Sequence, residues 1–413
     1  MTGPARAILT RLLRGIEGGS LTIVEPGRTR RFGAPDEALR VTVTFHDRGV
    51  WRSLLRGSTG LGATYMDGRW DADDVTALVR LAARNAAKID RLRRRFAVVV
   101  RPVQRLRGGR VNTPRRSRRQ IAAHYDLGND LFAAMLDERM LYSAGIFATP
   151  HTSLEDAQLA KLDAICTKLD LRPDDHLLEI GTGWGGFAVW ASTQYGCRVT
   201  TTTISEAQYR HARDWVRRIG DAGSRITVLR EDYRNLRGRF DKIVSIEMFE
   251  AVGLKHYDDY FGAVDRLLEV DGVMLLQTIT VDEQWFPRYR ETPDWIEKHI
   301  FPGGELASVG EILKSLGRAT HMSMHHAENI GTHYARTLRA WRDRFHARID
   351  EVRALGFDER FIRMWDLYLA YCEAAFLERH AGDFQLVLTK NNSARTLFNE
   401  VRAEREAGAS AVA

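Results

Sequence analysis

HLLEIGTGWGGF, from His176 to Phe187, is the stretch of sequence that decides the fold of this chain. A short apolar run contains the acidic Glu179 and then breaks into glycines, after which an apolar segment resumes. This order predicts a strand, a tight turn and the start of a helix. Glycines let the backbone pass close under a ligand, and a helix N-terminus presents free N–H groups. The stretch favours a ligand site, although such turns also occur for packing alone.

The residues after this turn have the composition of further strands. β-Branched or apolar runs recur at residues 198–204, 225–229, 240–246 and 272–277, with helical stretches between them. Strands that alternate with helices predict a parallel α/β sheet, with the ligand at the carboxyl ends of its strands. The predicted fold class is therefore α/β.

The position of the carboxylate indicates which ligand the turn binds. Gly181, Gly183 and Gly186 match the Gly-x-Gly-x-x-Gly spacing of dinucleotide sites, which also need an acidic residue about 20 positions further on. That place falls at Thr203, whereas the carboxylate of Glu179 precedes the turn. The arrangement resembles the S-adenosylmethionine site of a Rossmann-like class I methyltransferase, accompanied here by a smaller N-terminal α/β or α+β domain.

Composition limits the number of domains and the classes of protein to which this chain can belong. The chain has 413 residues, of which 44% are hydrophobic, so two or three domains with a large core are expected. Its three cysteines, Cys166, Cys197 and Cys372, are too few and too separated for a disulfide framework or a zinc site. No apolar run approaches the ~20 residues of a spanning helix, and the first 20 residues lack an apolar signal-peptide core. We expect a cytoplasmic protein that is soluble or lies on a surface.

Basic residues concentrate in one part of the chain. The net charge is +7, and between Arg84 and Arg119 fourteen Arg or Lys stand against one acid, Asp90. Such a run is typical of a solvated face or linker, and it also suits docking on phosphates of nucleic acid or of a lipid leaflet. Composition alone does not separate these two partners.

The predicted domains follow from this run. Residues 1–100 form an N-terminal lipid-docking or dimerisation domain, 101–119 a basic linker, 120–395 the methyltransferase domain and 396–413 a C-terminal tail. In the first domain, residues 21–24 and 39–45 alternate like strands, whereas 51–61 and 73–87 have helical patterns. Trp51, Tyr65 and Trp70 are expected in its core or at an interface.

Several longer motifs resemble those of a known family. They are HYDLGND (124–130), Tyr142-Ser143, LEIGTGWGG (178–186), SIEMFEAVG (245–253), IFPGG (300–304), HYARTLRAW (333–341) and YLAYCEAAF (368–376). From about His124 to Lys390 the chain resembles cyclopropane-fatty-acyl-phospholipid synthases, relatives of the mycolic acid cyclopropane synthases. The resemblance implies methyl transfer from S-adenosylmethionine to a cis double bond of a phospholipid acyl chain. The carbocation then loses a proton from the new methyl group, which closes the ring.

The resemblance also implies site residues. The cofactor shell would be Tyr142, Ser143, Glu179, Gly181, Gly183, Thr203, Ile204, Gln208, Asp232 and Tyr233, with Asp232 accepting a hydrogen bond from the adenine amine. A bound bicarbonate would be the base, held by Glu250, Ile279 and Tyr334. Gln277 occupies a further position of this shell, and Cys372 matches a cysteine often regarded as catalytic. Three alternatives stay open: Ser205 as a plain helix cap, Tyr142 as a core aromatic, and Glu250 in a salt bridge.

This sequence departs from the family at the base site. Ala144, Ala251 and Gln277 stand where the family has Cys, His and His. An alanine side chain neither donates nor accepts hydrogen bonds, whereas Gln277 does both. The expected product is a cyclopropane; the alternative is the same methyl transfer with loss of a different proton, giving an exocyclic methylene that a separate reductase would convert to a methyl branch.

The expected partner is the phospholipid bilayer, at the inner face of the cell membrane. A basic nucleic-acid-binding protein on a methyltransferase-like fold is a remote alternative, because no nucleic-acid-reading motif accompanies the arginine run. We therefore expect no nucleic-acid partner, and the sequence leaves a homodimer open.

Overall fold

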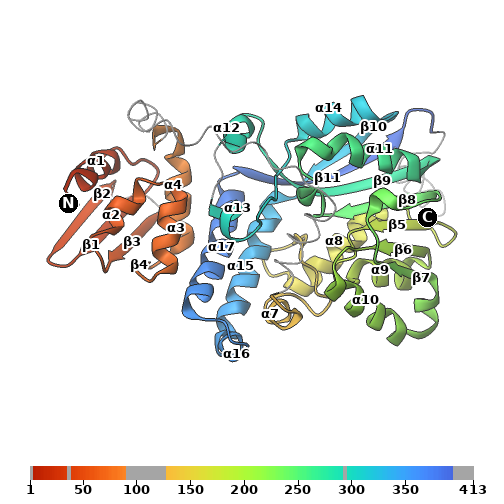
Figure 1. Cartoon of the computed structure of the whole chain (residues 1–413), viewed down its shortest axis with the longest axis horizontal. Helices are drawn as coiled ribbons and strands as arrows, with labels where there is room; N and C mark the ends of the chain where they lie inside the picture. Colours follow the sequence, from red (N-terminus) through yellow and green to blue (C-terminus); the bar gives the residue numbers. More distant parts are fainter. Residues whose placement is uncertain (1–2, 35–38, 90–126, 292–294, 394–413) are drawn as a thin grey trace, which may run out of the picture. The chain divides into compact units, whose positions relative to one another are not determined.

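The computed structural model describes residues 3–34, 39–89, 127–291 and 295–393 (Figure 1). The predicted linker, the C-terminal tail, nearly all of the basic run and the first three residues of the HYDLGND motif lie outside these ranges. The chain divides into two compact units, residues 1–111 with 288–302 and 338–381, and residues 112–287 with 303–337 and 382–413. Residues 288–302 and 338–381, which the sequence analysis places in the methyltransferase domain, thus group with the N-terminal segment.

The second unit contains a seven-stranded sheet in the order β10-β11-β9-β8-β5-β6-β7. The strands are β5 (His176–Ile180), β6 (Arg198–Thr202), β7 (Ile226–Leu229), β8 (Phe240–Ile246), β9 (Leu268–Val281), β10 (Met322–Asn329) and β11 (Ala381–Lys390). β7, β6, β5, β8 and β9 pair in parallel, whereas β10 and β11 pair antiparallel. The strand order reverses beside β5, and ligands of such sheets bind at the carboxyl ends of the strands at this point.

Helices cover both faces of this sheet because successive strand residues point to opposite sides (Figure 1). Leu177 packs in a core that includes side chains of α8 (Leu154–Lys168) and α9 (Gly186–Trp190). Its neighbour Leu178 packs in the core formed with α11 (Tyr257–Leu267) and α14 (Val309–Ala319). Strands buried on both faces read as continuous apolar runs, which is why the sequence revealed them.

The predicted α/β class and its five strands are confirmed. β10 and β11 were not predicted, and there is a physical reason why the sequence did not reveal each of them. β10 lies at the edge of the sheet and is mostly exposed, so its sequence MSMHHAEN lacks an apolar pattern. β11 interrupts its apolar run with Asp383 and Gln385, both fully buried. Two more α-helices of this unit in the described ranges are α7 (Asn129–Ala133) and α10 (Glu206–Arg218).

The first unit contains a four-stranded sheet in the order β2-β1-β3-β4 and several helices. Its elements are α1 (Gly3–Leu13), β1 (Ser20–Glu25), β2 (Arg28–Gly33), β3 (Arg40–Phe45), α2 (Val50–Leu54), α3 (Ser58–Met66), β4 (Trp70–Ala72), α4 (Val75–Arg84), α13 (Trp295–His299), α16 (Ile349–Ala354) and α17 (Glu359–Leu377). α12 (Phe286–Glu291) and α15 (Gly331–Ala347) each contribute residues to both units.

The single helix predicted over residues 51–61 is wrong. Gly57 has a φ of +68° and separates α2 from α3, because a left-handed residue does not continue a right-handed helix. The expectation of core aromatics is confirmed, since Trp51 and Trp70 are fully buried and Tyr65 nearly so. The indole of Trp51 donates to the buried carboxylate of Glu25 at 2.7 Å.

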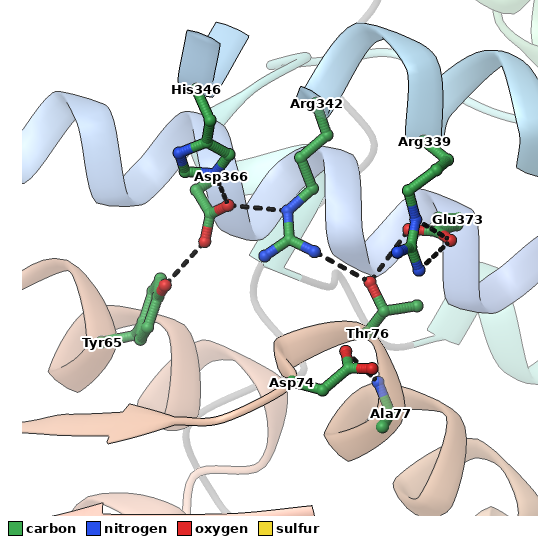
Figure 2. A network of polar contacts seen from close by, with 9 residues as sticks. All are labelled: Tyr65, Asp74, Thr76, Ala77, Arg339, Arg342, His346, Asp366 and Glu373. Carbon is green, nitrogen blue, oxygen red and sulfur yellow. Dashed lines mark hydrogen bonds and ion pairs between the residues drawn. The ribbon is translucent and has the colours of Figure 1, made fainter. Parts of the chain in front are cut away.

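Acidic residues of α17 hold the N-terminal helices within the first unit (Figure 2). Asp366 accepts a hydrogen bond from the Tyr65 hydroxyl at 2.6 Å and from Arg342 Nε at 2.7 Å. Two turns further along, Glu373 accepts from Thr76 Oγ1 at 2.9 Å and from Arg339 at 2.8 Å. These buried carboxylates are therefore paired with cations and hydroxyls, as burial of charge requires.

Candidate functional site

The glycine turn after β5 has the conformation that the sequence predicts. Gly181, Gly183 and Gly185 have φ values of +104°, +53° and +99°, which side-chain-bearing residues rarely adopt. Apart from Gly183 and its two chain neighbours, no heavy atom of the described residues lies within 4 Å of the place where a Cβ of Gly183 would stand. The turn therefore leaves open space beside the backbone, at the carboxyl end of β5.

Glu179 stands directly before this turn. Its side chain is buried, and one carboxylate oxygen accepts a hydrogen bond from Thr201 Oγ1 at 2.5 Å. Burial raises the pKa of Glu179 to about 8, against the opposing hydrogen bond from Thr201. Among the described residues Thr201 is the one side-chain donor to this carboxyl group, so the group keeps hydrogen-bonding capacity for the hydroxyl groups of a ribose.

The other predicted cofactor residues follow the ends of the next two strands. Thr203 donates to the side-chain oxygen of Gln208 at 2.9 Å, beside the half-buried Ile204. Ser205 caps α10 by accepting from the backbone of Gln208 at 3.3 Å, so its role as a helix cap is confirmed.

Asp232 and Tyr233 lie just beyond β7. The Asp232 carboxylate forms a two-pronged ion pair with Arg234, at 2.8 and 2.7 Å. The ring of Tyr233 packs edge-on against Tyr260, with 5.3 Å between the centroids. An adenine amine would therefore share Asp232 with Arg234 rather than be its sole partner.

Tyr142 and Ser143 reach the site from the segment after α7. The half-buried ring of Tyr142 contacts Phe132, with 5.2 Å between the centroids. Ser143 is buried, and its hydroxyl accepts from the ammonium of Lys161 at 2.7 Å. Burial lowers the pKa of Lys161 to about 8, although Glu247 and other nearby carboxylates oppose this shift. Lys161 was not predicted as a site residue.

These residues fit S-adenosylmethionine. The open backbone at Gly183 offers room for the methionine portion, and Glu179 offers an acceptor for the ribose. Thr203, Gln208 and Asp232 line the ends of β6 and β7, where the adenosine of such a cofactor would lie.

A cluster of polar side chains surrounds the carboxylate of Glu247, in the turn after β8. One oxygen of Glu247 accepts from the backbone N–H of Ala144 at 2.8 Å and from the side-chain amide of Gln277 at 2.9 Å. The other accepts from the hydroxyl of Tyr334 at 2.6 Å. Ala144, Gln277 and Tyr334 are buried, whereas Glu247 keeps part of its surface exposed.

Glu247 was not predicted as a site residue, because the sequence analysis regarded it as one more residue of the SIEMFEAVG motif. Its φ of +48° was a signal that only the structure supplies, since a left-handed conformation outside glycine is uncommon and concentrates at functional sites. Burial raises the pKa of the Glu247 carboxyl, against the hydrogen bonds from Tyr334 and Ala144.

Glu250 lies one turn later, in the short 3₁₀ helix Phe249–Ala251. Its Oε1 accepts from the backbone N–H of Ile279 at 2.6 Å and from Thr278 Oγ1 at 2.9 Å. Its Oε2 is shielded from solvent and has no hydrogen-bond partner among the described residues. Burial, followed by the charge of Glu247, raises the pKa of Glu250 to about 7. The alternative of an arginine salt bridge finds no support in the described part of the chain.

The structure thus brings Glu250, Ile279, Gln277 and Tyr334 together at the ends of β8 and β9. Cys372 does not join them in the second unit: it is half-buried on α17, in the first unit. The donors that the resemblance assigns to a bicarbonate, above all Tyr334 and Gln277, are engaged by a carboxylate of the protein itself.

Known proteins share both the sequence and the fold. The profile of the family described as mycolic acid cyclopropane synthetase matches residues 112–386. The tuberculostearic acid methyltransferase UfaA1 of Mycobacterium tuberculosis is 39% identical over 402 residues, which cover 94% of this chain and 92% of that protein. The cyclopropane-fatty-acyl-phospholipid synthase of Escherichia coli is 40% identical over 342 residues, covering 82% and 85%.

Solved structures of cyclopropane synthases are similar to this chain in fold. The cyclopropane synthase MmaA2 from Mycobacterium tuberculosis matches with a TM-score of 0.62 and 30% identity, over 66% of this chain and 98% of its own. The mycolic acid cyclopropane synthase CmaA1, complexed with SAH and CTAB, matches with a TM-score of 0.61 and 31% identity, over the same shares of the two chains. The chain therefore belongs to the mycolic acid cyclopropane synthetase family and is an S-adenosylmethionine-dependent lipid methyltransferase.

Proposed function

We propose that this enzyme methylates the cis double bond of an unsaturated phospholipid acyl chain and that Glu247 is the base that completes the reaction. The observation that carries the proposal is the position of the Glu247 carboxylate, between Ala144, Gln277 and Tyr334. These are positions where the family resemblance places the groups around a bicarbonate. A carboxylate bound to the chain would therefore replace the bicarbonate.

S-adenosylmethionine supplies a methyl group on a positively charged sulfur. Glu179, Gly183, Thr203, Gln208 and Asp232 would orient that group, and a dry site would contribute to the rate through orientation and loss of water. Methylation of one alkene carbon leaves a cation on its neighbour.

Glu250 would stabilise this cation. Its Oε2 lacks a hydrogen-bond partner among the described residues, so its negative charge is not neutralised by a contact. Because the cation exists only after methyl transfer, this interaction would favour the intermediate and the transition state over the ground state.

Two products are open to the cation. Loss of a proton from the new methyl group at once closes a cyclopropane. If a hydride first moves from the methylated carbon to its cationic neighbour, loss of a methyl proton instead gives an exocyclic methylene. Both routes remove a methyl proton, rather than the different proton that the sequence analysis expects for the methylene, so the time before the base acts decides between them.

We infer that the methylene is the main product. Glu247 is attached to the backbone and held by three donors, so it is less free than a bound ion to approach the new methyl group. A delayed proton loss gives the hydride time to move. The likeness to a tuberculostearic acid methyltransferase over 94% of this chain supports this product, and a separate reductase would then yield a methyl branch. The likeness to the Escherichia coli cyclopropane synthase keeps the cyclopropane as the second candidate.

The substrate would be reached at a bilayer surface. Within the described ranges, no helix has both the length and the hydropathy needed to span a membrane. Arginines of α1 and β2 gather on the first unit, where Arg30 donates to Thr10 at 2.8 Å. Burial lowers the pKa of Arg30, and the charges of Arg28, Arg6 and Arg14 lower it further. A cluster of like charges suits the phosphates of an anionic leaflet.

Product analysis tests the proposal. Lipids of a host that expresses the enzyme and makes cis-unsaturated phospholipids would be converted to methyl esters and analysed by gas chromatography with mass spectrometry. We expect methylene-branched esters as the main new species. Cyclopropane esters alone would refute the assignment of the product, and unmodified lipids with active cofactor turnover would refute the assignment of the substrate.

A further inference from the structure

Asp383, on β11, is a fully buried carboxyl group without a cationic partner among the described residues. Its Oδ2 accepts from the side-chain amide nitrogen of Gln277 at 3.1 Å, while Oδ1 is shielded and has no hydrogen-bond partner in the described chain. The same nitrogen of Gln277 donates to Glu247 at 2.9 Å. Glu247 and Asp383, the carboxyl pair, are therefore bridged by one amide group.

The orientation of that amide is determined by a third residue. The side-chain oxygen of Gln277 accepts from the amide nitrogen of Gln385 at 2.9 Å, so its two N–H groups remain for the carboxyl pair. Gln277 and Gln385 are both fully buried, which excludes water as an alternative partner for most of their surface. The amide thus has one hydrogen for each carboxyl group.

One amide does not neutralise two negative charges. Two carboxylates that share a buried site do not ionise together at neutral pH, because each charge raises the pKa of the other. Burial, together with the charges of Glu247 and Glu250, holds the pKa of Asp383 well above its ordinary value. The pair should therefore keep one proton.

The two members differ in the hydrogen bonds that they accept, which indicates where the proton resides. Asp383 accepts from Gln277, whereas Glu247 accepts from Ala144, Gln277 and Tyr334. Hydrogen bonds to an anion favour its charged form. The charge belongs on Glu247 and the proton on Asp383.

We propose that Asp383 and Glu247 share one proton, which Asp383 holds while Glu247 is the ionised base. Asp383 is then a positioning residue that keeps the pair singly charged; its link to turnover rests on the role proposed above for Glu247. In each cycle Glu247 gains a proton of the methyl group, and the C–H electron pair left behind becomes the π bond of the methylene, or the ring-closing bond where a cyclopropane forms. The pair then holds two protons and returns one to solvent before the next turnover.

Other charged groups surround the pair and must be considered with it. Glu250 faces it from the 3₁₀ helix after β8, Lys161 from α8 and Tyr334 from α15. Lys168 of α8 hydrogen-bonds to Gln385 and pairs with Glu328 of β10. Lys161 bonds to Ser143 rather than to either member of the pair, so it does not replace the shared proton.

Thermal stability tests the shared proton without any need for turnover. Asp383→Asn keeps the shape and neutrality of a protonated Asp383. The raised pKa in the folded state gives wild type a stability contribution that is present below about pH 4 and is lost as pH rises. The melting temperature of Asp383→Asn should therefore exceed that of wild type at about pH 8, and the difference should shrink towards about pH 5.

Asp366→Asn is the matched control, because it makes the same chemical change in a carboxylate bonded to Arg342. This variant should melt below wild type at about pH 8, where Asp366 is ionised. If Asp383→Asn also melted below wild type there, or if its difference from wild type did not change with pH, the shared proton would be refuted.

Methyl transfer measured against pH tests the positioning role. Wild type should lose activity at alkaline pH, when the second carboxyl ionises and the pair repels. Asp383→Asn should keep most of its neutral-pH activity and lack this alkaline decline. Superimposable pH profiles would overturn the positioning role. An active Glu247→Gln enzyme, with the melting data as expected, would instead overturn the proposed base and leave the shared proton standing.

Discussion

Replacing Glu247 by glutamine should abolish most of the turnover and leave cofactor binding intact. Glutamine has nearly the same shape, and its oxygen can still accept from Ala144 and Gln277. It has no negative charge and does not accept a proton at neutral pH. The variant therefore removes the base while it keeps the surrounding structure.

The expected loss follows from the chemistry of the group. A positioned general base contributes roughly 10²–10⁴-fold to a rate. At about 1.36 kcal/mol for each factor of ten, the barrier should rise by about 3–5 kcal/mol. Stability should change less, because the lost hydrogen bond from Tyr334 to a charged oxygen, worth about 1.5–3 kcal/mol, is offset by removal of a partly buried charge.

The assay is transfer of a labelled methyl group from S-adenosylmethionine to phospholipid vesicles, with cofactor binding measured by calorimetry. Glu269→Gln is the matched control, because Glu269 lies on β9 of the same unit and its side chain is 45% exposed. It should turn over like wild type. If Glu247→Gln retained wild-type turnover, or if it failed to bind cofactor, the role of Glu247 as a base would be refuted.

Glu250→Gln should also abolish turnover and leave cofactor binding intact, and an active variant would refute the electrostatic role of Glu250. Because the pKa of Glu250 is raised to about 7, wild-type activity should rise with pH through that value. The raised pKa also means that stability falls as pH rises from about 4, where the unfolded carboxyl ionises, to about 7, where Glu250 ionises in the folded state. Gly183→Val should block cofactor binding in calorimetry and cost roughly 1–2 kcal/mol of stability, since its φ is +53°; wild-type binding would refute the site. Asp366→Asn should lower stability by about 3–5 kcal/mol at neutral pH, because Arg342 loses its carboxylate partner. Burial alone would raise the pKa of Asp366, but hydrogen bonds from His346 and Arg342 lower it. The loss of stability should therefore vanish only as pH falls below about 4. Binding to anionic vesicles should weaken steeply with salt, because each basic residue contributes on the order of 1 kcal/mol within a Debye length of ~8–10 Å. Binding should also fall when Arg91, Arg93, Arg94 and Arg95, which lie outside the described residues, become Gln; salt-independent binding would count against the basic run as the docking segment.

A triple substitution probes the departures from the family. Changing Ala144 to Cys, Ala251 to His and Gln277 to His should raise the cyclopropane share of the product if these positions delay proton loss. Gln277 is the most informative of the three, because its amide bridges the carboxyl pair. An unchanged ratio of products would show that they do not control the timing.

The sequence alone determined the sheet and the cofactor turn. The five parallel strands are apolar or β-branched runs, of which β5, β6 and β8 are largely buried, and the turn is marked by glycines at Gly181, Gly183 and Gly185, which the backbone requires there. Both signals are local, because each depends on residues that are neighbours in the chain. The motifs were long enough to identify the family as well.

Tertiary structure alone decided the composition of the base site. Glu247 meets Ala144 from 103 positions away, Gln277 from 30 and Tyr334 from 87, and Asp383 joins through an amide 106 positions from it. No local sequence pattern predicts these contacts. They depend on the order of the strands in the sheet, which determines whose ends lie side by side. Residues 338–381 likewise group with the N-terminal segment because the acids of α17 find their partners there, at Tyr65 and Thr76 (Figure 2). The sequence identifies which residues carry charge, whereas their protonation and partners are consequences of burial that only the folded chain creates.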